Sequence, residues 1–276
     1  MRSSRTSRSL WLAGVVAVCC GFPGQPLPAA EGPGLQTCVD RLRTADLEEQ
    51  QLCLRRLKGA GPDAAVATQA LCDLLTRSDG ATNHVLIASA LDVLRSLGPR
   101  AAPAAETLSG LLPHRSKLYT GRDKLPVVRL RAYIVVTLSE IGFPSSALPA
   151  LLDSLAHVDE RMNAMEAGAA ARAVRALGPS GCSLAPYLLD ALNQRVGEEE
   201  FSLERYEPQF PPHEATTIQL EAVRSLGEVC AAKDLEVVTA LRELAGAHGQ
   251  AGPDPRVARE AQRALENIQK GHGERR

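Results

Sequence analysis

The stretch Leu94-Arg95-Ser96-Leu97-Gly98-Pro99 ends an apolar run with a glycine and a proline, and versions of it return along the chain. Successive glycines of these versions lie 37, 44, 36 and 49 residues apart. A period near 40 residues predicts a stack of helix pairs, each packed on its neighbours, rather than a compact domain. The counterparts are Leu57…Gly61-Pro62, Leu138-Ser139-Glu140-Ile141-Gly142, Val174-Arg175-Ala176-Leu177-Gly178-Pro179 and Val223-Arg224-Ser225-Leu226-Gly227.

Each unit reads as a first helix, a Gly/Pro turn and a second helix rich in alanine and leucine. The closing glycine can adopt the left-handed conformation that ends a helix, and a proline after it cannot extend that helix. An early proline in the second helix, such as Pro149, costs little because the first turn lacks N–H partners anyway. Apolar residues at helical spacing mark the first helix of the third unit: Val128, Ala132, Val135, Leu138 and Ile141.

The run from Leu177-Gly178-Pro179 to Ala185-Pro186-Tyr187-Leu188-Leu189 resembles HEAT repeats. The closest type is the short bacterial repeat of exported HEAT-repeat proteins and phycobilin-lyase relatives, and the likeness covers about residues 37–270. It implies an all-α fold, a right-handed α-solenoid of about five helix pairs plus a terminal half-repeat. We assign residues 31–270 to this solenoid and 271–276 to a short polar tail.

The first thirty residues have the layout of a secretory signal peptide. Three arginines precede an eleven-residue apolar run, Leu10 to Cys20, and small residues and prolines follow up to Ala30. A disordered tail is one alternative, and a lipoprotein anchored through Cys19 or Cys20 is another. Removal of residues 1–30 takes three arginines and no acidic residue, so the net charge becomes −4 in place of −1. A mildly acidic chain argues against a nucleic-acid partner.

Five cysteines follow the predicted signal peptide. Cys182 and Cys230 occupy nearly equivalent places in adjacent units, so a bridge between them is conceivable. Stacked helices lie about 8–10 Å apart, however, whereas a disulfide needs Cα atoms within about 7 Å. We therefore expect these cysteines to be small buried hydrophobic residues.

Insertions at 113–126, 194–214 and 246–256 interrupt the repeat between one unit and the next, where insertions often mark a binding edge. The 194–214 insertion holds three of the seven aromatic residues that follow the leader, together with several glutamates. An aromatic flanked by charge is typical of an interface anchor. The alternative is that the rings tuck onto the solenoid. The candidate partner-binding residues here are Glu199, Glu200, Phe201, Tyr206 and Phe210.

The 113–126 insertion is basic. It could meet an anionic partner, pair with the acidic insertion or form a solvated loop, and exposed ion pairs of about 1 kcal/mol would not fix either loop alone. Its candidate partner-binding residues are Arg115, Lys117, Tyr119 and Arg122.

Sequence motifs for catalysis, nucleotide binding or metal binding are weak. Gly59-x-Gly61-x-x-Ala64 follows no predicted strand, which a dinucleotide fingerprint requires. His213-Glu214 resembles the His-Glu pairs of deoxyhypusine hydroxylase, but that enzyme needs several pairs and this chain has one. Ligands of one metal must converge within a few ångströms, and equivalent positions of stacked repeats do not. We therefore expect helix-end or turn roles for His84, His114, His157, His213 and His248.

The sequence thus predicts an exported, non-enzymatic scaffold that binds a protein partner through the concave surface of the second helices and an edge of loops. It predicts no cofactor, no metal and no nucleic-acid partner. One alternative is a membrane-surface lipoprotein adaptor, which requires lipidation at Cys19 or Cys20. The other is a HEAT-type lyase or chaperone with a small-molecule cofactor.

Overall fold

A computed structural model describes residues 34–156, 164–193, 199–246 and 254–273. The predicted signal peptide with Cys19 and Cys20, and the histidines His157 and His248, lie outside these ranges. None of the helices in this part of the chain combines the length and apolarity that a membrane span requires.

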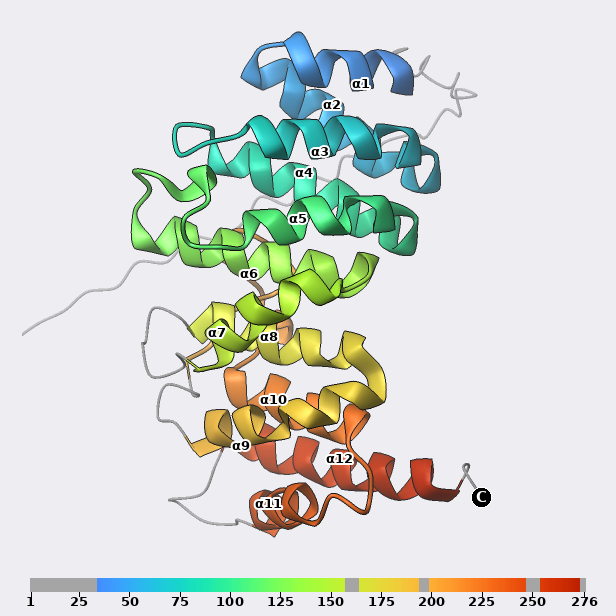
Figure 1. Cartoon of the computed structure of the whole chain (residues 1–276), viewed down its shortest axis with the longest axis vertical. Coiled ribbons are helices and arrows are strands. Elements are labelled where there is room, and N and C mark those ends of the chain that lie inside the picture. The colour runs from blue at the N-terminus through green and yellow to red at the C-terminus, as the bar shows by residue number, and fades with distance from the viewer. Residues whose placement is uncertain (1–33, 157–163, 194–198, 247–253, 274–276) are drawn as a thin grey trace, which may run out of the picture. The chain divides into compact units, whose positions relative to one another are not determined.

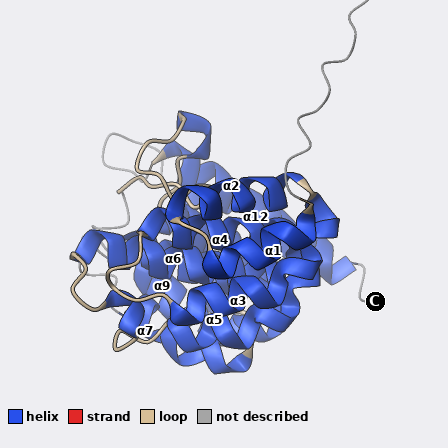
Figure 2. Ribbon diagram, turned by 90° about the horizontal axis from the view of Figure 1, so that it is seen from above, coloured by secondary structure: helices blue, strands red, loops and turns tan. Residues whose placement is uncertain are grey.

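The described residues form twelve α-helices, joined in several places by short 3₁₀ segments (Figures 1 and 2). The helices are α1 (Leu35–Thr44), α2 (Leu47–Gly59), α3 (Thr68–Arg77), α4 (His84–Leu97), α5 (Ala105–Leu111), α6 (Lys124–Ile141), α7 (Leu148–Ala156), α8 (Ala164–Ala173), α9 (Ala185–Asn193), α10 (Ile218–Val229), α11 (Leu235–Gly246) and α12 (Pro255–Gly273).

The helices pack in two layers. In one layer α2, α4, α6, α8, α10 and α12 contact one another in succession, and the odd-numbered helices flank them in the other. The predicted five pairs are α2/α3 through α10/α11, with α12 as the terminal half-repeat and α1 as an additional first helix. The all-α solenoid is confirmed.

Glycines close the first helix of most units as predicted. Gly98 and Gly142 are the capping residues of α4 and α6, with φ values of +54° and +127°. Gly178 also has a positive φ, +58°, but it lies within the 3₁₀ segment Val174–Leu184 that follows α8. Gly227 is the exception, because it lies inside α10 and does not end the helix. Its missing side chain serves packing instead: a Cβ there would lie 2.5 Å from Cβ of Ala264 in α12.

A buried ion pair fastens the middle of the stack. Arg131 of α6 donates from Nε to Oε1 of Glu166 in α8 at 2.9 Å, and both side chains are almost completely buried. Arg131 also donates to the carbonyl of Leu112 after α5, and Ser154 of α7 donates to Glu166 at 2.7 Å. Since every charge here has partners, the pair joins four elements without an uncompensated buried charge.

Candidate interaction site on the strap-bearing face

Part of the 194–214 insertion folds back across the even-numbered helices. We call residues 199–217 the strap. Phe201 and Thr216 exchange backbone hydrogen bonds of 3.0 and 2.9 Å, which close the strap into a loop just before α10. Phe201 is 6% exposed and Leu203 only 1%, so the beginning of the strap is part of the hydrophobic core.

Phe201 fills a gap that a glycine leaves in α8. A Cβ on Gly168 would lie 2.1 Å from Cζ of the Phe201 ring, far inside normal contact distance. The surrounding α8 residues are small, since the sequence reads Ala167-Gly168-Ala169-Ala170-Ala171. This row of small side chains lets the ring lie directly on the helix backbone.

Glu204 of the strap is held between two arginines of the solenoid. Its carboxylate accepts from Arg95 of α4 at 2.9 Å and from Arg172 of α8 at 2.7 Å. Arg95 also donates to the backbone carbonyls of Leu203 and Glu204. Burial opposes ionisation of Glu204, but the hydrogen bonds and charges of Arg172 and Arg95 outweigh it and lower the pKa.

The ionic contacts continue from the strap towards α12. Glu221 of α10 is fully buried and accepts from Arg172, from Arg175 at 2.6 Å and from Arg224 at 3.2 Å. Burial raises the pKa of the Glu221 carboxyl, but the charges of Arg172 and Arg175 and the hydrogen bonds from Arg172 and Thr216 lower it by more, so the net shift is downward. Arg224 then reaches Glu260 of α12 at 3.5 Å.

Tyr206 lies at the far end of the strap, over α4 and α6. Its ring centre is 5.6 Å from that of His84 and 5.8 Å from that of Tyr133, the latter in an edge-on arrangement. Burial raises the pKa of the Tyr206 hydroxyl to about 12, so the side chain is neutral at physiological pH. The ring is half-buried in contacts within the chain.

A cleft of about 150 Å³ opens between the strap, α6 and α8. Its apolar lining comes from Leu125 and Val128 of α6, Met165 of α8 and Phe201 and Phe210 of the strap. The charged side chains that line it within the described ranges are the exposed glutamates Glu199, Glu200 and Glu207 and the basic residue Arg129.

A second groove, of about 420 Å³, is lined by residues of the strap, α2 and α4. Its lining is mixed in charge, and Lys58 and Asp92 within it form a 2.7 Å ion pair. Tyr206 faces this groove, whereas Phe201 and Phe210 line the cleft. The predicted anchors therefore divide between two hollows.

Comparison with known proteins bears on the fold. No protein-family model and no curated protein matches the sequence. Among solved structures, an engineered protein matches with a TM-score of 0.53 at 21% identity, over 87% of this chain and all of its own. The chain has a HEAT/armadillo-like repeat fold. A designed armadillo repeat protein also matches, with a TM-score of 0.44 at 17% identity, over 85% of this chain and all of its own.

The basic insertion of this HEAT/armadillo-like chain is fastened within the fold. Arg122 donates to the carbonyls of Asp79 and Thr82 at 2.7 and 2.5 Å, and Tyr119 is buried. Arg122 therefore joins two neighbouring inter-repeat loops, and Tyr119 packs inside the fold. Arg115 and Lys117 are exposed, as the prediction requires.

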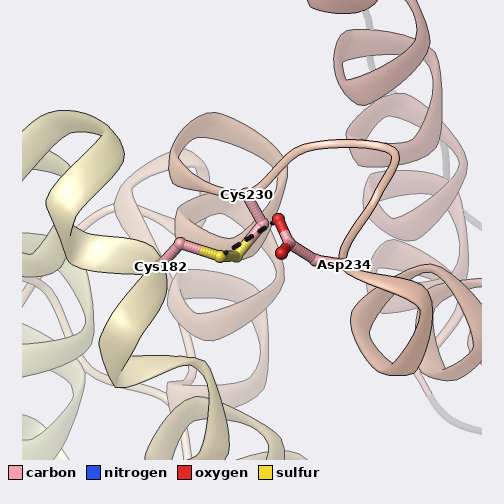
Figure 3. Close-up of side chains that lie close together, drawn as sticks. All are labelled: Cys182, Cys230 and Asp234. Atoms are coloured by element: carbon pink, nitrogen blue, oxygen red, sulfur yellow. Dashed lines mark hydrogen bonds between the residues drawn. A yellow bond between two sulfur atoms is a disulfide. The ribbon is translucent and has the colours of Figure 1, made fainter.

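The expectation for Cys182 and Cys230 is wrong, because the two residues form a disulfide (Figure 3). Their Cα atoms lie 5.0 Å apart, well under the spacing of helix axes. The reason is their location: Cys182 lies in the 3₁₀ turn after Gly178 and Cys230 at the end of α10, and turns approach more closely than helices do.

Asp234 completes a small cluster with the disulfide. Its carboxylate lies 3.4 Å from Sγ of Cys182 and accepts from the Ala231 backbone N–H at 2.7 Å. The three side chains are close enough to share a metal ion. A disulfide has no thiolate to offer, however, so in this oxidised state the cluster is a covalent staple and not a set of metal ligands.

The histidines within the described residues occupy helix ends and turns. His84 is the first residue of α4, His114 lies in the loop after α5, and His213 lies in the 3₁₀ turn Pro212–Glu214. Glu214 pairs with Arg205 at 2.5 Å, so the His213-Glu214 dipeptide takes part in holding the strap.

Sequence reasoning missed the arginines that hold the strap and α10. Arg95, Arg175 and Arg224 share the second position of the repeated Leu/Val-Arg-x-Leu-Gly motif, and each forms an ion pair with a glutamate of an even-numbered helix. The third unit has Ser139 at this position. An arginine that recurs in step with the repeat was the available signal for an ionic row along one face.

Proposed function

We propose that this chain is an exported, non-enzymatic scaffold that binds a protein partner on the face carrying the strap. Repeat solenoids present extended surfaces built from equivalent helices, and such surfaces suit contact with another chain. The observation that carries the proposal is the cleft beside the strap, where apolar side chains of three separate elements converge at the surface.

The proposed face differs from the one that the sequence favoured. The strap with its aromatic residues lies on the even-numbered helices, which are the first helices of each unit, and not on the second helices. Phe210, Glu199 and Glu200 remain candidate contact residues, whereas Phe201 contributes mainly by shaping the floor of the cleft.

Export is supported by two independent features. The arginine-led apolar segment before residue 30 has the pattern of a signal peptide, and the Cys182–Cys230 disulfide suits an oxidising compartment. Intact mass of the protein recovered from outside the cytoplasm tests this part, since a chain beginning at Glu31 is expected. A full-length chain retained in the cytoplasm would contradict it.

Binding can be tested with a displayed library of random peptides panned against the full chain. Two matched variants locate any binding: Leu125→Gln in the cleft and Leu235→Gln in α11. Both leucines are exposed near the start of a helix, 43% and 73% respectively, but Leu235 belongs to the other layer. We expect a recurrent peptide motif whose binding is lost only in Leu125→Gln. Absence of any motif, or equal binding by both variants, would refute the proposal.

A further inference from the structure

We infer that the cleft beside the strap receives a single large apolar side chain of the partner, flanked by basic residues. The inference rests on the proposed function and adds the chemistry of the partner segment. Its basis is the size of the cleft and the distribution of charge around it.

The size of the cleft sets the first half of the inference. Sites for drug-sized molecules enclose about 300–1,000 Å³, and this cleft encloses about 150 Å³. That volume suits one bulky side chain, such as leucine, methionine or phenylalanine. Pockets that take one anchoring side chain are typical of the centre of a protein interface.

The walls of the cleft are suited to such an anchor. Leu125 is 43% exposed, and Met165 and Phe210 are half-buried, so an incoming side chain would cover apolar surface that solvent now contacts. Phe201 is already fixed against Gly168, and it provides a rigid floor. Methionine is flexible and polarisable, so Met165 can adjust to anchors of different shape.

Charge sets the second half of the inference. Among the described residues, three glutamates line the cleft against one arginine, Arg129. Glu200 is held by Arg256 of α12 at 2.6 Å, and Glu207 is exposed at the rim, so Glu207 is the carboxylate to test. A partner with lysine or arginine on either side of its anchor would complement this rim, and an acidic segment would be repelled.

Three synthetic peptides test the inference by fluorescence anisotropy on the full chain: GKKFKKG, GKKGKKG and GEEFEEG. We expect GKKFKKG to bind. Loss of the phenylalanine should weaken binding by about 30-fold or more, the effect of removing an interface hot spot. Glu207→Lys should weaken GKKFKKG by up to about fivefold, as expected for an exposed charge pair, and should favour GEEFEEG.

The outcomes separate this inference from the proposed function. Equal binding of GKKFKKG and GKKGKKG would show unspecific attraction and would refute the anchor. Preference for GEEFEEG over GKKFKKG by the wild-type chain would refute the basic flank. A library motif that depends on Leu125 but lacks basic residues would leave the scaffold intact and overturn the inference alone. The Leu235→Gln variant should bind GKKFKKG as the wild type does.

Discussion

Replacement of Gly168 by alanine should loosen the strap, because the new methyl group would lie 2.1 Å from Cζ and 2.7 Å from Cε2 of Phe201. Carbon atoms in contact lie about 3.5–4.0 Å apart, so the ring must withdraw by about 1.4 Å. Overpacking of this kind costs about 1–3 kcal/mol. In the Phe201→Ala background the clash is absent, and alanine should then stabilise α8 by about 0.5–1 kcal/mol relative to glycine.

Gly168→Ala should therefore lower the free energy of unfolding when Phe201 is present and raise it in the Phe201→Ala background. The coupling between the two substitutions in a double-mutant cycle should be about 1–3 kcal/mol. Urea unfolding followed by circular dichroism gives the free energies. Hydrogen exchange of the Phe201 and Thr216 amides reports the strap itself, because these amides bond to each other's carbonyls. Gly110→Ala in α5 is the control, since a Cβ there contacts nothing within 4 Å. An equal effect of Gly168→Ala in both backgrounds would refute the docking of Phe201 on α8.

Three further predictions concern the Cys182–Cys230 staple, the clamp that Arg95 and Arg172 form on Glu204, and the last helix. Replacing Cys182 and Cys230 by serine should lower the free energy of unfolding by up to about 4 kcal/mol, because the disulfide joins residues 48 positions apart. Dithiothreitol should lower the melting temperature of the wild type and leave that of the serine variant unchanged. A wild type that dithiothreitol does not affect would contradict this prediction. The pKa of Glu204 is lower in the folded state than in the unfolded state. The contribution of Glu204 to the free energy of unfolding is therefore present above the unfolded-state pKa, and it is lost as the pH falls through the folded-state pKa. Urea melts should therefore show Glu204→Gln as less stable than wild type near neutral pH but not in strong acid, whereas a gap independent of pH would argue against the clamp. Gly227→Ala should lower the free energy of unfolding by about 1–3 kcal/mol, because the new methyl group would clash with Ala264. Amide hydrogen exchange in α12 should then be faster, and unchanged exchange there would contradict the packing of α12 on Gly227.

The repeat architecture was predictable because it depends on local signals. Gly98 and Gly142 end helices for reasons that lie within a few residues of each, and apolar residues at helical spacing mark the buried faces. Gly227 shows the limit of this reasoning. The same Leu-Gly pair occurs in α10, but close packing of α12 explains the glycine there, and that contact is made by a residue 37 positions later.

The site was predictable only in part, because its geometry depends on contacts distant in sequence. The composition of the 194–214 insertion identified Phe201 and Phe210, which do line one cleft. The direction in which the strap folds depends on Arg95, which is 109 residues from Glu204, and on the gap at Gly168. The disulfide was missed because the spacing of helix axes was applied to two residues that lie in turns.

The most direct test of the cleft is the methyl spectrum of the full chain labelled with ¹³C at its three methionines. Met165 lines the cleft, and its signal can be assigned from the Met165→Leu variant. On addition of GKKFKKG, the Met165 methyl signal should shift to saturation, and GKKGKKG should leave it unchanged. A peptide that binds without moving the Met165 signal would place the binding site elsewhere and contradict the account.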